Sequence, residues 1–131
     1  MKNHLTIFIL FTLILSSCDP ALKVKYEIVN KTANPIIVKF QFVHNRSGYT
    51  SSQVVSVPGN QSKIVNEDDE LGYIDHYNER LDSISLYKLI IQQGNKNTRI
   101  NFKDKKYWIL KKNGEQEGVY QLIFDSTLLN F

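Results

Sequence analysis

The strongest constraint on the fold is a regular alternation of apolar and polar residues along much of the chain. In the segment Lys23–Asn30 (KVKYEIVN) every second residue is apolar: Val24, Tyr26, Ile28. The segment Pro35–Val43 (PIIVKFQFV) continues the pattern with β-branched and aromatic residues. A period of two places such side chains on one face of an extended strand, whereas a helix needs apolar residues every three or four positions. The sequence therefore predicts a protein built from strands.

Further short runs of the same character follow, and turn-forming residues such as Pro58-Gly59-Asn60 and Asn113-Gly114 separate most of them. The predicted strands are Gln53–Val57, Ser62–Val65, Ser83–Ile91, Thr98–Phe102, Tyr107–Leu110 and Val119–Phe124. Seven or eight strands in about 100 residues are typical of two packed sheets. The expected fold is all-β, a seven- to eight-stranded antiparallel β-sandwich with Ig-like or similar topology.

A different segment precedes these strands. Lys2 is followed by the apolar run Leu5–Leu15 (LTIFILFTLIL) and by the small residues Ser16 and Ser17. This order of positive charge, apolar core and small residues is typical of a secretory signal peptide. A transmembrane helix needs roughly 20 apolar residues, about twice the length of this run. We therefore expect residues 1–17 to be a cleaved N-terminal signal helix.

The only cysteine, Cys18, directly follows this segment. Leu15-Ser16-Ser17-Cys18 resembles the lipobox of bacterial lipoproteins, an aliphatic residue and two small residues before a cysteine. The resemblance implies cleavage between Ser17 and Cys18 and lipidation of the Cys18 thiol. The acyl chains on Cys18 would then anchor the chain in a lipid bilayer. The alternative is a free cysteine buried in an N-terminal helix. Two or three acyl chains hold a protein stably on a membrane, and one does not.

The expected domain organisation is a signal peptide over 1–17, a lipidated tether over 18–22 and a β-sandwich domain over 23–131. The chain after the cut would have 131 − 17 = 114 residues, a length that suits one domain. It has no second cysteine for a disulfide, so its core alone must stabilise it.

The charge balance indicates no particular partner. The formal net charge is +3, and removal of Lys2 with the signal peptide leaves +2. Acidic residues gather at Glu67–Glu70, while lysines are frequent in the last third of the chain. Such runs are typical of solvated faces, and no basic motif with interleaved aromatic residues predicts binding to nucleic acid.

The order of these features resembles the small lipoproteins of the Bacteroidetes. The resemblance covers the lipobox and the stretches KYEIVNKTANPIIVKF, VSVPGNQSKIV, LDSISLY and VYQLIF. It implies a β-sandwich anchored to a membrane of the bacterial cell envelope, and it brings no activity with it. In that group an acidic run after the lipidated cysteine accompanies export to the surface. Here only Asp19 is acidic, so both the periplasmic and the surface face are open.

The same resemblance suggests modification by sugars. In that group O-glycans are attached at Asp followed by Ser or Thr and then by an apolar residue or Thr. Asp82-Ser83-Ile84 and Asp125-Ser126-Thr127 fit the pattern, which makes Ser83 and Ser126 candidate O-glycosylation sites. A pattern of three residues also arises by chance.

One stretch without alternation, residues 66–81, is expected to be a long loop and is the candidate binding loop. Its polar and aromatic side chains are the candidate contacts: Asp68, Asp69, Glu70, Tyr73, Asp75, His76, Tyr77, Glu79. The alternative is that its tyrosines pack against the core and its acidic residues are merely solvated.

Motifs for catalysis and for metal binding are missing from the sequence, so no catalytic residue, metal ligand or cofactor is predicted. The leading hypothesis is a non-catalytic, membrane-anchored binding or structural module with an unknown protein or glycan partner. The alternative is a small metal-dependent or hydrolytic enzyme centred on the 66–81 loop and His76.

Overall fold

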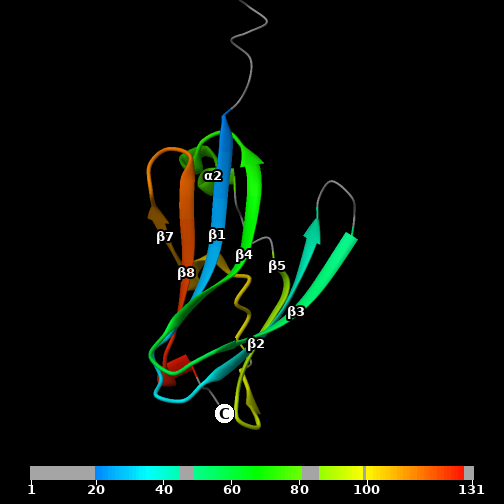
Figure 1. Cartoon of the computed structure of the whole chain (residues 1–131), viewed down its shortest axis with the longest axis vertical. Coiled ribbons are helices and arrows are strands. Elements are labelled where there is room, and N and C mark those ends of the chain that lie inside the picture. The colour runs from blue at the N-terminus through cyan, green and yellow to red at the C-terminus, as the bar shows by residue number, and fades with distance from the viewer. Residues whose placement is uncertain (1–19, 45–48, 81–85, 99, 129–131) are drawn as a thin grey trace, which may run out of the picture.

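The computed structural model describes residues 20–44, 49–80, 86–98 and 100–128, and these residues form a β-sandwich (Figure 1). The described part has eight strands: β1 (Ala21–Asn30), β2 (Ile36–His44), β3 (Tyr49–Val57), β4 (Ser62–Leu71), β5 (Leu86–Gln93), β6 (Lys96–Asn97), β7 (Trp108–Lys112) and β8 (Glu117–Phe124). The first sheet has the order β4-β1-β8-β7 and the second β3-β2-β5-β6. Every pair is antiparallel except β1 with β8. The predicted all-β sandwich is confirmed.

The first four strands form one long two-stranded ribbon that passes from one sheet to the other. Ala21 in β1 faces Leu71 in β4 at one end, and His44 in β2 faces Tyr49 in β3 at the other. The turns 31–35 and 58–61 lie between the two halves of the ribbon, and the register of the β1–β4 half shifts between Tyr26 and Glu27. We call this place the corner. Its two halves contribute an antiparallel pair to each sheet, so residues 21–71 connect both layers.

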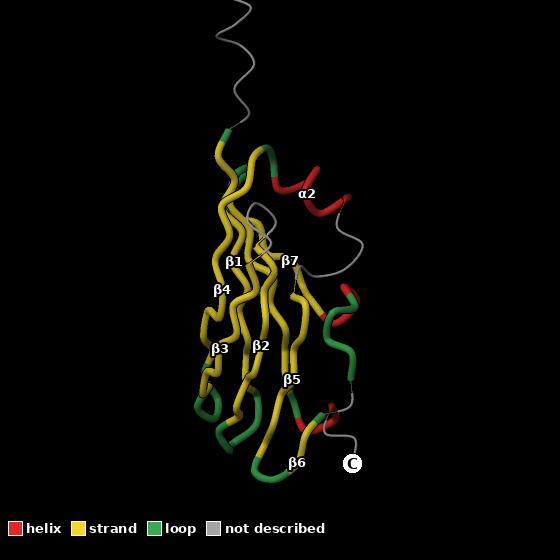
Figure 2. Tube along the Cα trace, turned by 90° about the vertical axis from the view of Figure 1, so that its right-hand side faces the viewer, coloured by secondary structure: helices red, strands yellow, loops and turns green. Residues whose placement is uncertain are grey.

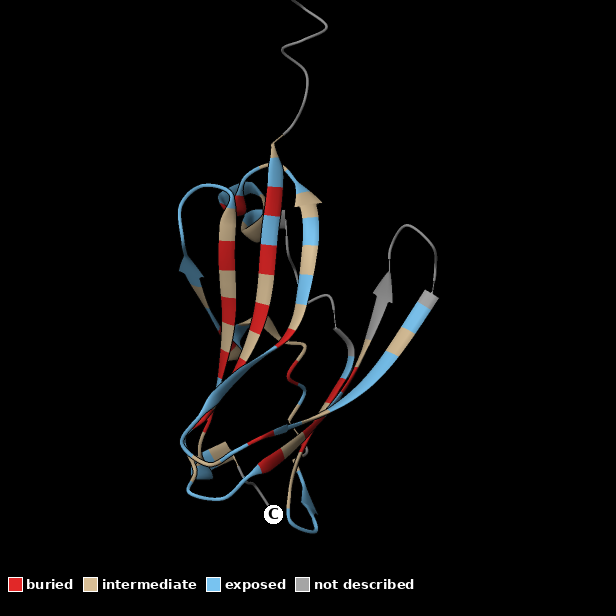
Figure 3. Cartoon of the chain, viewed as in Figure 1, coloured by how far each residue is buried: buried red, intermediate tan, exposed pale blue. Residues whose placement is uncertain are grey.

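The core lies between the sheets, where the alternating apolar residues meet. Every second residue of β1 is buried, from Leu22 to Asn30, as the banding in Figure 3 shows. The parallel neighbour β8 is buried in the same rhythm, and β2 supplies the facing side chains of the second sheet. Alternation in the sequence thus marks the buried face correctly. The largest fully buried apolar side chains include Tyr26, Phe40, Phe102, Tyr120 and Phe124.

The corner is held by Asn30, the only polar side chain among the fully buried residues of the described part. Its Nδ2 donates to the carbonyl oxygens of Asn34 (2.8 Å), Pro58 (3.1 Å) and Val57 (3.2 Å). Its Oδ1 accepts from the backbone N–H (3.0 Å) and the hydroxyl (2.7 Å) of Thr32. A buried polar group needs hydrogen-bond partners, and the Asn30 carboxamide finds its partners in both turns. It therefore joins the two turns.

Three predictions about the elements are wrong. The described residues of the predicted strand 98–102 do not form a strand; the short β6 precedes them, and Phe102 is buried from a loop. The tether was expected to include residues 21 and 22, but β1 begins at Ala21 and Leu22 is buried in the core. Residues 66–81 are not a long loop, because β4 continues to Leu71 and a helix, α2, covers Ile74–Arg80.

Two short 3-10 turns complete the described chain, η1 (Lys105–Tyr107) before β7 and η2 (Ser126–Leu128) after β8. No helix within the described ranges has the length and apolar character needed to cross a membrane. The predicted signal helix, Ser17, Cys18 and Ser83 lie outside the described residues.

Candidate functional site

The segment predicted as a binding loop lies at one end of the sandwich, beside the start of β1. We call this the proximal end, because it includes Pro20, the first described residue. It also contains the β4–α2 connection and the β7–β8 turn (Asn113–Gln116). The Gly72 N–H donates to the Pro20 carbonyl (2.8 Å), and the Ile74 N–H donates to the Glu115 carbonyl (2.9 Å). Figure 2 shows α2 standing beside the sheets at this end. These bonds fix the start of the helix to two strand ends.

The acidic run is part of β4 and not of a loop. Asp69 faces Lys23 of β1, whereas Asp68 and Glu70 face the buried residues Val24 and Leu22. Successive side chains of a strand point to opposite faces, so the three carboxylates do not converge. Asp68 accepts a hydrogen bond from Asn66 Nδ2 (3.1 Å).

The solvent-facing side of α2 and the residue that precedes the helix, Tyr73, carry four of the predicted contact residues. Tyr73 and His76 meet edge to face, with 6.2 Å between ring centroids. Asp75 forms an ion pair with Lys112 of β7, and Glu79 is exposed. Tyr73, at the start of the helix, is 41% exposed. This exposed aromatic pair is the part of the predicted set that could contact a partner.

The other side of α2 is attached to the core. Ile74 is fully buried, and the Tyr77 hydroxyl lies 3.2 Å from the hydroxyl of Tyr26. The Tyr120 hydroxyl donates to Asn78 Oδ1 (2.9 Å), and Lys105 Nζ donates to the Asn78 carbonyl (2.5 Å). Tyr77 therefore packs against the core, which is the alternative that the sequence left open for this tyrosine.

The tyrosines under α2 form an aromatic cluster. The rings of Tyr26 and Tyr120 are stacked with their centroids 5.8 Å apart, and the rings of Tyr77 and Tyr120 lie 6.5 Å apart. Burial, with a contribution from Tyr77, raises the pKa of Tyr120 to about 12. A phenol with this pKa stays neutral at ordinary pH, where it serves as a hydrogen-bond donor to Asn78.

The sequence reasoning missed Ile74 and Asn78, which hold the helix in place. Ile74 was the one detectable signal, since it is a lone β-branched apolar residue within a polar stretch. Its side chain lies against Gly118, where an added Cβ would come within 2.5 Å of Ile74 Cδ1. A small residue at 118 thus makes room for the helix anchor.

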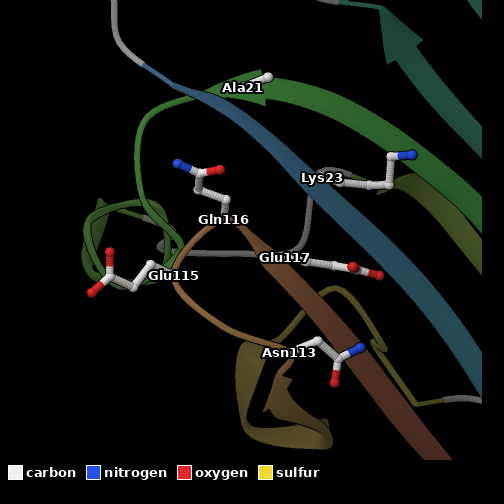
Figure 4. A pocket seen from close by; sticks show the side chains of 6 residues that line it. All are labelled: Ala21, Lys23, Asn113, Glu115, Gln116 and Glu117. Atoms are coloured by element: carbon white, nitrogen blue, oxygen red, sulfur yellow. The ribbon is translucent and has the colours of Figure 1, made fainter.

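A shallow pocket of about 490 Å³ opens at the same end, next to the β7–β8 turn (Figure 4). Its lining is mostly polar and comprises Ala21, Lys23, Asn113, Glu115, Gln116 and Glu117. Glu117 already pairs with Lys25, whose Nζ lies 2.5 Å from its Oε1. The hydrogen bond between them raises the pKa of Lys25 and lowers the pKa of Glu117. The lining residues are exposed except for the half-buried Glu117, so the pocket offers polar contacts from Lys23 and Gln116 at the surface.

A reaction centre does not emerge from these positions. The described part of the chain contains no group of three or more His, Cys, Asp or Glu side chains placed to hold a metal ion. His76 lies on the exposed side of α2, and the pocket just described is lined by other residues. The arrangement can bind a partner through exposed aromatic and polar groups.

The second candidate glycosylation site lies in η2. Ser126 is exposed, and the preceding Asp125 accepts hydrogen bonds from the N–H (2.8 Å) and the hydroxyl of Thr127. These bonds lower the pKa of Asp125. The Ser126 hydroxyl is thus accessible on a short, ordered turn.

Comparison of this chain with protein-family models, with curated proteins and with solved structures finds no match. The assignment of the fold therefore rests on the strand pairing and the buried core described above. A function has to be argued from the sequence signals and from the surfaces of this molecule.

Proposed function

We propose that this chain is a lipoprotein of the bacterial cell envelope, anchored to a membrane through acyl chains on Cys18. In this proposal the β-sandwich is a non-catalytic binding or structural module for a protein or glycan partner. The observation that carries the proposal is Leu15-Ser16-Ser17-Cys18 directly after the apolar run Leu5–Leu15. The periplasmic face and the outer surface are both compatible with it.

The position of the domain relative to Cys18 supports the anchor. β1 begins at Ala21, three residues after Cys18, and a chain of this length spans at most about 10 Å. The proximal end would then lie close to the lipid headgroups. A partner that contacts Tyr73 and His76 would approach along the membrane surface.

The enzyme alternative has less support. It requires His76 and carboxylates of residues 66–81 to converge on one site. Asp75 and Glu79 share the exposed side of α2 with His76, but Asp75 is paired with Lys112, and the described residues contain no group of three or more His, Cys, Asp or Glu side chains placed to hold a metal ion. A binding module needs only an accessible surface on a rigid frame. The exposed side of α2, held by Ile74 and Asn78, has this character.

The anchor is tested with the full chain, expressed in a bacterium that processes lipoproteins and is fed a labelled fatty acid. The parent should incorporate the label and remain in the membrane fraction. Cys18→Ser should incorporate no label and accumulate as the longer precursor. Ser17→Ala keeps a small residue before the cysteine and should behave like the parent. Cleavage of Cys18→Ser at the same bond, with the label retained, would refute the proposal.

A further inference from the structure

The edges of the two sheets differ in how they are protected. β4 carries the charged run Glu67–Glu70, β7 ends in Lys111 and Lys112, and β6 has only two residues. Charge and short length are the common devices that prevent an edge strand from pairing with another chain. The fourth edge, β3, has nine residues (YTSSQVVSV) and contains neither a charge nor a proline.

The outer side of β3 is available for pairing. β3 is the terminal strand of its sheet and pairs only with β2. Among the described residues, no backbone hydrogen bond of a turn or loop involves Ser52, Val54 or Ser56. In Figure 1 this side of β3 faces away from the rest of the chain, and Figure 3 shows the described part of the strand as largely exposed. Among the described strands, none therefore lies along the outer side of β3 at Ser52, Val54 and Ser56.

Val54 marks the middle of this edge. It is 66% exposed, more than any other large apolar residue in the described part of the chain. Its neighbours on the same face, Ser52 and Ser56, are small, uncharged and exposed. Val55 and Val57 point the other way, toward the core. An isolated apolar residue between two small polar ones can be covered by a strand that lies alongside.

We propose that two copies of this chain pair through their β3 strands, antiparallel, about a two-fold axis at Val54. In such a pair Val54 faces Val54 of the second copy, and Ser52 faces Ser56 of the second copy. The two second sheets then continue as one sheet of eight strands, and the edge N–H and C=O groups are satisfied across the axis.

The absence of charge on β3 favours a second copy of the chain as the partner of this edge. In a two-fold pair a strand meets its own sequence, so like charges come together and destabilise the pair. β4 would bring its Glu67–Glu70 carboxylates toward those of a second copy, whereas β3 has no charge to repel itself. A single strand pair is small beside a standard protein interface, so the dimer should dissociate on dilution.

The test measures the protein mass of the full chain in detergent by light scattering over a series of concentrations. The mass should rise to that of two chains. Val54→Lys and Val54→Glu should each stay monomeric over the same range, because each places like charges on the axis. An equimolar mixture of the two variants should regain the doubled mass, since opposite charges then face each other.

Ile109→Lys is the matched control, because Ile109 is 51% exposed on β7, an edge strand of the first sheet, and this variant should dimerise like the parent. A parent chain that stays monomeric throughout would overturn the proposal. Dimerisation of both Val54 variants, or a mixture that fails to regain the doubled mass, would overturn it as well. Strand content by circular dichroism should be equal in all of these proteins, since both substituted positions are exposed.

Discussion

The corner predicts a large loss of stability for Asn30→Ala. The Nδ2 group carries two hydrogens and has three carbonyl oxygens within 3.2 Å, so at most two of these bonds form fully. Two further bonds reach Oδ1 from Thr32. Four bonds at about 1 kcal/mol each give about 4 kcal/mol, reduced to about 3 kcal/mol because water can reach Thr32 and Asn34.

Asn30→Asp tests the same contacts with almost no change of shape. An ionised carboxylate only accepts hydrogen bonds, so one of its oxygens would face the three carbonyl oxygens that Nδ2 now binds. Burial and these oxygens should raise the carboxyl pKa in the folded state above its unfolded value of about 3.9. The protonated form is then favoured in the folded state. The variant should therefore be closest to the parent at acid pH and lose stability as the pH rises through this window.

The assay is thermal and urea unfolding of the parent and the variants at several pH values. For a domain of this size, about 3 kcal/mol corresponds to a decrease in Tm of about 10–20 °C. Asn34→Ala is the control, because the corner uses the Asn34 carbonyl while its side chain is exposed. If Asn30→Ala lowers Tm no more than Asn34→Ala does, the corner is not held by the Asn30 carboxamide.

Three further predictions follow from single contacts. Gly59→Ala should lower the free energy of unfolding in urea by about 1–3 kcal/mol, because its Cβ would lie 2.0 Å from the Ala33 carbonyl oxygen. Gly118→Ala should lower it less, because its Cβ would meet only side-chain atoms, those of Ile74 and Leu110, which can shift more easily than backbone. Ile74→Ala should lower the free energy of unfolding by about 2–5 kcal/mol. A short linker in place of residues 68–79 should unfold the domain, whereas a loop would tolerate this replacement. In an ultraviolet titration of the folded protein, one tyrosine should ionise near pH 12, and this step should be absent from Tyr120→Phe. The raised pKa also means that the stability due to Tyr120 is lost as the pH rises from about 10 toward 12.

The sequence predicts the strands best where one face is buried. In β1, β2 and β8 the apolar residues alternate because each strand lies inside its sheet and packs one face on the core. Edge strands are less constrained: half of the residues of β4 are charged, and all except Val65 are exposed or half-buried. For this reason the prediction ended this strand at Val65, and its remaining six residues were assigned to a loop. The pairing of β1 with β8 lies between residues far apart in the chain and leaves no local signal.

Two stretches that carried the resemblance to small lipoproteins, KYEIVNKTANPIIVKF and VSVPGNQSKIV, contain the two turns of the corner. Their sequence pattern has a physical cause in this structure. Asn30 must be an amide because its Nδ2 donates to both turns while its Oδ1 accepts from Thr32 in the first turn. Gly59 must lack a Cβ because the Ala33 carbonyl lies against it. Sequence alone identifies these residues as turn formers. Only the fold shows that the two turns touch.

The helix α2 could not be predicted for a related reason. It has seven residues, and a helix this short has too few turns for an apolar period to appear and is not stable by itself. It forms because Ile74 is buried against Gly118 and because Asn78 accepts from Tyr120, contacts made with a strand more than 40 residues away. The aromatic and polar residues of this segment suggested a recognition surface, and Tyr73 and His76 remain on the exposed side. The contacts that hold them there belong to the core, so a variant that probes binding should change Tyr73 or His76 and leave Ile74, Tyr77 and Asn78 intact.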